Sequence, residues 1–296
     1  MRIFMTGAPG FIGSALIPQL IQAGHQVLGL TRSEAGAETL RALGAEVKYG
    51  NIEDLDSLRD GTAQSDGVIH LAFNHDFSQF EKNAADDRKA IEAMGEVLVG
   101  SNRPFVITSG TGIAANVDGK SSTEESPVLI WIPRAAAETL MQELAARGVV
   151  TSVVRLPQVH DTRKQGLVPY VTAVAREKGV SAYIGDGSNR WPAAHVSDVA
   201  RLYRLAFEKA EAGAVYHAVD EEGVSMKAIA EALGRGLKVP VVSIKPEETD
   251  AHFGWLGRFA GHNMPSSSTL TQQKLNWKPT GPGLIADLDG MDYTQA

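Results

Sequence analysis

The chain has 296 residues, a formal net charge of −7 and no cysteine. A chain of this length buries a large core without disulfides or a structural metal, and the missing cysteines exclude disulfides, thiolate nucleophiles and cysteine-ligated metals. The negative charge argues against a nucleic-acid surface, because phosphate neutralisation requires clustered Lys and Arg.

Short β-rich segments alternate with amphipathic helical segments along the chain. The predicted strands are residues 2–6, 26–31, 46–50, 67–72, 105–109, 151–156 and 214–219. Between them, segments such as GSALIPQLIQAG and AAAETLMQELAARG have helical spacing of apolar residues. This alternation predicts an α/β fold with a doubly wound parallel sheet that helices cover on both faces.

The organisation changes after about residue 157, where loops lengthen and Gly, Pro and Trp become frequent. We expect a smaller C-terminal α/β region that binds the substrate. The predicted division assigns residues 1–160 plus 193–219 to a nucleotide-binding domain and residues 161–192 plus 220–296 to the smaller region.

A glycine-rich loop, TGAPGFIG, spans residues 6–13 between the first predicted strand and the following helix. This context is typical of the dinucleotide-binding (Rossmann) loop, in which glycines allow a tight turn, close approach of the pyrophosphate and helix packing. The helix N-terminus offers free N–H groups to phosphate. The alternative is a strand-to-helix turn that binds no ligand. The predicted contacts with a dinucleotide are Thr6, Gly7, Gly10, Phe11, Ile12 and Gly13.

The end of the second strand reads Thr31-Arg32-Ser33, with no acidic residue before Glu34. An acid near this place binds the ribose 2′-hydroxyl of NAD, whereas an arginine suits the 2′-phosphate of NADP. We therefore expect Thr31, Arg32 and Ser33 to contact the cofactor, with NADP(H) favoured over NAD(H). The alternative is that Arg32 is a solvated loop charge.

With this loop, the sequence resembles the extended or atypical short-chain dehydrogenase/reductases, often called NAD-dependent epimerase/dehydratases. The segments that carry the resemblance, in order, are GNIEDLDSL (50–58), VIHLA (68–72), VRLPQVH (154–160), HVSDVARL (195–202) and LNWKPT (275–280). The resemblance implies further cofactor contacts at Asn51, Ile52, Leu71, Ala72, Phe73, Thr108, Arg134, Pro157 and Val159.

The catalytic residues depart from this family pattern of Ser/Thr, Tyr-x-x-x-Lys and an upstream Asn. None of the six tyrosines is followed by lysine four residues later. The Tyr place holds Ile130, the Lys place Arg134 and the Asn place Asp87, while Thr108 and Ser109 remain. By this resemblance we expect Thr108 and Ser109 to orient a carbonyl and Arg134 to hold ribose or an oxyanion.

The missing tyrosine leaves the proton donor open. His75 and His160 follow strands at the carboxyl edge of the sheet, where ligands of such folds bind, and histidine is the usual acid at neutral pH. Alternatively, His75 is a solvated loop residue and His160 a packing residue. Asp87 is a third candidate if burial raises its pKa, and the alternative is a structural hydrogen-bonding role.

The sequence thus favours an NADP(H)-dependent oxidoreductase that transfers hydride to or from a small carbonyl or alcohol. A catalytically silent NADP(H)-binding sensor and a sugar-nucleotide epimerase are the alternatives. No metal is expected, since no cluster has metal-ligand spacing. No apolar run reaches the ~20 residues of a membrane span, and no signal peptide is recognised, so we expect a cytoplasmic protein. Relatives are often dimers, which makes a homodimer a further expectation.

Overall fold

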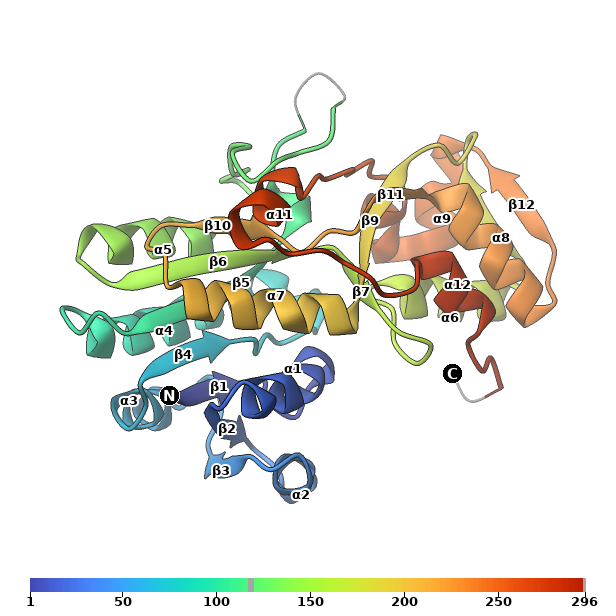
Figure 1. Cartoon of the computed structure of the whole chain (residues 1–296). Helices are drawn as coiled ribbons and strands as arrows, with labels where there is room; N and C mark the ends of the chain where they lie inside the picture. Colours follow the sequence, from blue (N-terminus) through green and yellow to red (C-terminus); the bar gives the residue numbers. More distant parts are fainter. Residues whose placement is uncertain (117–119, 295–296) are drawn as a thin grey trace.

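A computed structural model describes residues 1–116 and 120–294. Its main sheet has seven parallel strands in the order β10-β6-β5-β4-β1-β2-β3 (Figure 1). These strands are β1 (Arg2–Thr6), β2 (Gln26–Thr31), β3 (Glu46–Tyr49), β4 (Gly67–His70), β5 (Pro104–Gly110), β6 (Val150–Leu156) and β10 (Val215–His217). Each of the predicted strands forms one of them, so the predicted fold class is confirmed.

Helices cover both faces of this sheet. One face carries α1 (Phe11–Gln22), α2 (Glu34–Ala42) and α7 (Val196–Lys209), whose apolar residues share one core cluster. The other face carries α3 (Leu55–Ala63), α4 (Phe80–Leu98) and α5 (Ala135–Ala146), which share a second cluster. The strands are therefore apolar on both sides, as expected of a parallel sheet between two helical layers.

The remaining strands form two small sheets. The three-stranded sheet contains β7 (Gln158–His160), β9 (Arg190–His195) and β11 (Glu221–Ser225), and the two-stranded sheet contains β8 (Ser181–Ile184) and β12 (Val241–Ile244). The helices around them are α6 (Val168–Lys178), α8 (Met226–Leu237), α9 (Thr249–Phe253), α10 (Gly257–Ala260) and α12 (Leu284–Asp289). Figure 1 shows this group beyond the carboxyl end of β6.

Two segments lie across the expected division of the chain. Strand β9 pairs with β7 and β11 and not with the main sheet, although residues 193–219 were expected to rejoin it. Helix α11 (Thr269–Leu275) lies beside β10, and Trp277 joins the core under α7 (Figure 1). The division into two domains therefore stays a prediction. Among the described residues, no helix is both long and apolar enough to cross a bilayer.

Candidate active site and cofactor cleft

The glycine loop brings backbone close to backbone between β1 and α1. Gly7 has a φ of 65°, and a Cβ there would lie 2.8 Å from the Ala72 nitrogen. A Cβ at Gly10 would lie 2.9 Å from the Gly7 oxygen, and one at Gly13 only 2.4 Å from the Ala8 oxygen. No side chain caps helix α1, and its first turn holds no acid. The loop therefore leaves a helix N-terminus open to an anion such as a pyrophosphate.

The structure gathers half of the predicted cofactor contacts, together with His75, around one cleft at the carboxyl edge of the sheet. The predicted residues that line it are Gly7, Gly10, Thr31, Arg32, Ser33, Asn51, Ile52, Ala72, Phe73 and His75. Sequence reasoning missed other lining residues, namely Pro9, Leu30, Gly50, Glu53 and Asn74. The remaining predicted contacts do not line this cleft: Thr6 ends β1, Phe11, Ile12 and Gly13 begin α1, Val159 lies in β7, and Leu71 and Pro157 follow β4 and β6. Their roles stay predictions. Thr108 and Arg134 are described below.

The end of β2 presents a cation and turns its nearest acid away. Arg32 lines the cleft, is exposed and forms no ion pair with any residue that the structure describes. The carboxylate of Glu34 instead accepts from Arg41 at 2.7 Å and from the Tyr49 hydroxyl. The bond from Arg41 and then that from Tyr49 hold the pKa of Glu34 below its usual value. This corner of the cleft is therefore positive on balance.

Thr108, at the end of β5, has its hydroxyl occupied within the protein. It donates to the His70 carbonyl oxygen at 2.7 Å and lies 2.7 Å from the hydroxyl of Tyr203 on α7. A threonine has a single proton to donate, so Thr108 has none left for a substrate carbonyl. This corrects the expectation that Thr108 orients the carbonyl oxygen. Tyr203 is fully buried on α7, and the sequence gave no reason to assign it a role at the site.

Ser109, the next residue, differs in this respect. Its side chain is 4% exposed, and its hydroxyl has no hydrogen-bond partner among the described residues. A buried hydroxyl without a partner is uncommon, because leaving one unsatisfied is destabilising. The Ser109 hydroxyl is therefore an unused, buried donor near the end of β5, and Ser109 is not among the residues that line the cleft.

Arg134 and Asp87, which occupy the Lys and Asn places, form an ion pair. Both side chains are at least nine-tenths buried. Arg134 also donates through Nη2 to the Thr108 carbonyl at 2.8 Å, and its Cζ lies 4.0 Å from the centroid of the Phe73 ring. Two of its nitrogens are thus engaged by the protein, and its expected hold on ribose or an oxyanion stays a prediction.

Burial alone would raise the pKa of Asp87. The nearby Arg134 charge and the hydrogen bond from His70 outweigh burial, so the pKa lies below its usual value. The expected rise of the Asp87 pKa is therefore not found, which removes the support for a role as proton donor. Its alternative, a structural hydrogen-bonding role, stays a prediction. An ionised carboxylate only accepts, so the His70 Nε2, 3.1 Å from Asp87, is the donor.

His70 extends this network to the glycine loop. Its Nδ1 lies 2.7 Å from the Thr6 hydroxyl, which also accepts from the Ala72 N–H at 3.2 Å. The chain of contacts from Arg134 through Asp87 and His70 thus ends where the glycine loop begins. His70 lies within the segment VIHLA, but its residue type alone gave no signal of this role.

The two histidine candidates occupy different environments. His75 is exposed, lines the cleft and lies edge-on to Phe73 at 5.5 Å between ring centroids. Although the residue as a whole is exposed, desolvation of the imidazole by the protein around it lowers the pKa of His75, and the Lys164 and Arg134 charges add smaller effects. His160 is fully buried in β7, and its Nδ1 lies 2.6 Å from Asp287 on α12. The structure therefore places His75 at the cleft, whereas it encloses His160 in the three-stranded sheet.

Ile130, in the Tyr place, is 79% exposed and lies before the start of α5.

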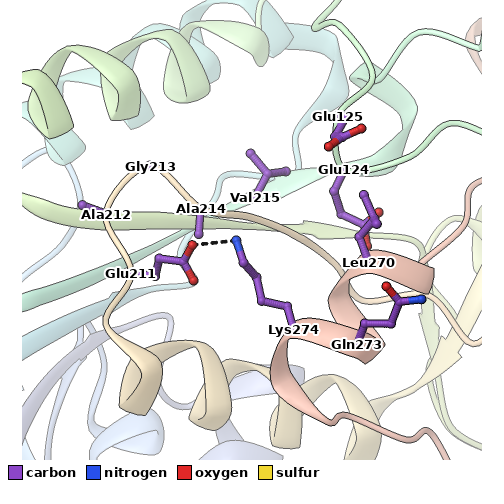
Figure 2. Close-up of a pocket in the computed structure, with 10 residues that line it drawn as sticks. All are labelled: Glu124, Glu125, Glu211, Ala212, Gly213, Ala214, Val215, Leu270, Gln273 and Lys274. Atoms are coloured by element: carbon purple, nitrogen blue, oxygen red, sulfur yellow. Dashed lines mark ion pairs between the residues drawn. The ribbon is translucent and has the colours of Figure 1, made fainter.

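A second hollow lies at the β10 edge of the main sheet, next to α11. Figure 2 shows Glu211 paired with Lys274 there, at 2.6 Å, and Glu124 near Leu270. None of the predicted site residues lines this hollow, so it is separate from the cofactor cleft.

Comparison with known proteins agrees with this geometry. A model of the NAD dependent epimerase/dehydratase family matches residues 3–220. An uncharacterized protein of Schizosaccharomyces pombe is 50% identical over 99% of this chain and 100% of its own length. The chain therefore belongs to the NAD dependent epimerase/dehydratase family.

More distant relatives have stated activities. The 4-hydroxy-2-methyl-3-oxo-4-farnesyl-3,4-dihydroquinoline-1-oxide ketoreductase of Stigmatella aurantiaca is 26% identical over 86% of this chain and 80% of its own. The dTDP-glucose 4,6-dehydratase of Streptomyces venezuelae, solved with NAD bound, has a TM-score of 0.79 at 18% identity. That match covers 99% of this chain and 96% of the dehydratase and supports the fold.

Proposed function

We propose that this member of the family is an NADP(H)-dependent oxidoreductase that transfers hydride between the nicotinamide and a small carbonyl or alcohol. The observation that carries the proposal is the cleft, where the open glycine loop and Arg32 face one space. The reductase activity named for the Stigmatella relative supports a carbonyl substrate. The free hydroxyl of Ser109 and the histidine beside the cleft supply the polar groups that such a reaction needs.

The residues of this chain fit the cofactor. The backbone around Gly7 and Gly10 would hold the pyrophosphate, and the Arg32 guanidinium would pair with a 2′-phosphate. Asn51 and Ile52 would border the adenine. Bound NADPH would supply the hydride.

The protein groups would perform the remaining steps. Ser109 donates a hydrogen bond to the carbonyl oxygen and so polarises the bond that receives the hydride. His75, when protonated, gives its proton to the oxygen as the alcohol forms. Arg134, held by Asp87 and Thr108, fixes the Phe73 ring at the edge of the cleft.

A titration by calorimetry with NADPH and with NADH tests the cofactor part. We expect tighter binding of NADPH, weakened about tenfold or more in Arg32→Ala with NADH unchanged, since a lost charge-assisted contact costs about 1.4 kcal/mol or more. Arg59→Ala is the control, because Arg59 lies outside the cleft and pairs with Asp56; it should leave both affinities unchanged. Equal affinity for both cofactors would refute the role of Arg32.

Turnover separates this proposal from its alternatives. An oxidoreductase consumes NADPH when a carbonyl is added, whereas a silent sensor binds it and turns over nothing. An epimerase converts its sugar with no net change in the cofactor. Ile130 in the Tyr place favours the sensor as the second candidate, because isoleucine cannot transfer a proton.

A further inference from the structure

An array of aromatic side chains extends outward from the cofactor cleft. It begins with Phe73 and His75, which line the cleft, and continues to Phe77, whose ring centroid lies 6.2 Å from that of His75. Phe77 is stacked on Trp255 at 5.4 Å with an interplanar angle of 18°. Three segments far apart in the sequence therefore contribute to one aromatic surface: the β4–α4 loop, α6 and the α9–α10 segment.

The outer part of the array surrounds Phe77. The Tyr170 ring lies edge-on to Phe77 at 6.0 Å and to Trp255 at 5.2 Å, and Phe259 lies 6.1 Å from Phe77. The backbone beneath Phe259 is anchored, because the buried Trp191 donates to its carbonyl at 3.1 Å. These distances are those of favourable aromatic pairs, so the array is a preformed surface.

This surface is still partly open. Trp255 is 48% exposed and Tyr170 is 37% exposed. Exposed aromatic rings next to a ligand cleft leave apolar area that a ligand can remove from water. A planar apolar ring laid against the exposed parts of these rings would remove that area from water.

Three cations border the array. The Lys164 charge acts on His75 at the inner end, and Arg134, also at the inner end, is already neutralised by Asp87. At its outer end Arg258 lies over the Phe259 ring, 5.0 Å from the centroid, and is exposed. Between these two ends the array presents Phe77, Trp255, Tyr170 and the His75 imidazole. A nucleotide sugar would need cations for its diphosphate where these rings lie.

We propose that the array of Phe77, Tyr170, Trp255 and Phe259 is the substrate-recognition surface, and that the substrate is a planar, uncharged aromatic carbonyl compound. The inference rests on the proposed function, because the array would hold the ring at the mouth of the cleft with its carbonyl directed to Ser109 and His75. The reaction balances as carbonyl plus NADPH plus a proton giving alcohol plus NADP⁺. The hydride adds to the carbonyl carbon, and the proton from His75 adds to the oxygen.

The test measures binding before turnover. Calorimetry on protein saturated with NADP⁺ would compare acetophenone with cyclohexyl methyl ketone, its saturated counterpart. We expect acetophenone to bind at least tenfold more tightly, and Trp255→Ala to remove most of that difference. Trp131→Ala is the matched control, because Trp131 is 74% exposed and has no ring contact within the array. It should leave the preference intact.

Three outcomes would overturn the proposal. One is equal binding of the two ketones, and another is the same loss in Trp131→Ala as in Trp255→Ala. The third is tight binding of dTDP-glucose that depends on Arg258. NADP⁺ binding is measured first in every variant, so failure of the cofactor proposal is seen separately. Ketone binding without turnover would support the recognition surface and refute only the oxidoreductase reaction.

Discussion

Replacing Asp87 with asparagine should destabilise the protein substantially. The change leaves the Arg134 guanidinium nine-tenths buried without its counter-charge, while the amide oxygen still accepts from His70. Removing one partner of a buried pair costs about 3–5 kcal/mol. The retained hydrogen bonds place Asp87→Asn at the lower end, at about 3 kcal/mol of unfolding free energy.

Urea unfolding followed by tryptophan fluorescence measures this loss, since Trp191 and Trp277 are fully buried. Asp86→Asn is the matched control on the same helix. Asp86 pairs with Lys82, whose side chain is 56% exposed, and such surface pairs contribute less than about 1 kcal/mol.

A double-mutant cycle tests whether the pair acts as a unit. Asp87→Asn with Arg134→Met removes both charges of the pair, and should lose at least about 1 kcal/mol less than the two single changes added together. Additive losses, or a loss below about 1 kcal/mol in Asp87→Asn alone, would refute the reasoning.

Three further predictions concern catalysis, the loop and pH. His75→Gln should lower kcat/KM by ~10²-fold and leave the affinity for NADPH unchanged. In the wild type, the reduction rate should fall as the pH rises through the pKa of His75, which lies below the usual 6.5, because the proton donor must be protonated. A flat pH profile would contradict this role. Gly13→Ala should weaken NADPH binding at least about tenfold, because the added Cβ would lie 2.4 Å from the Ala8 oxygen. Gly110→Ala is the control, because its added Cβ would meet no atom closer than 3.8 Å. Calorimetry measures both affinities, and similar values would contradict the steric argument. Burial, then the Arg155 charge, lowers the pKa of His217 to about 3. Between pH about 6.5 and about 3 the unfolded chain therefore binds one proton more than the folded chain, and the free energy of unfolding should fall by up to about 1.4 kcal/mol per pH unit of acidification. The difference between the urea midpoints at pH 7 and pH 5 should shrink in His217→Asn, and an unchanged difference would contradict the assignment.

The fold was predictable because its signals are local. The apolar segments that form β1 to β6, and the glycine loop after β1, carry their pattern within a few residues. The second sheet was less predictable. Strand β9 begins with Arg190 and Trp191 and contains a proline, and its partners β7 and β11 are determined by contacts distant in the sequence.

The site was predictable to the extent that it follows strand ends. The cleft gathers residues after β1, β2, β3 and β4, as expected for a parallel sheet. Thr108 shows the limit, because its hydroxyl is engaged by Tyr203, 95 residues away. The stack of Phe77 on Trp255 likewise joins segments that no periodicity connects.

The departures from the family pattern are better explained together than separately. In that pattern a lysine lowers the pKa of the tyrosine, and an uncompensated cation serves this purpose. Ile130 has no proton whose pKa could be lowered, so a free cation at residue 134 would bring the cost of burial without that benefit.

Asp87 removes this cost by neutralising Arg134. Arg134 contacts the Thr108 carbonyl and the Phe73 ring. Asp87 is linked through His70 to the start of the glycine loop. One neutral amide and one lysine are thereby exchanged for an anion and a cation, so the charge beside the cleft falls by one. A less positive inner wall is consistent with an uncharged aromatic substrate and unfavourable for a diphosphate. The neutralised Arg134 is therefore consistent both with Ile130 in the Tyr place and with the uncharged substrate proposed above.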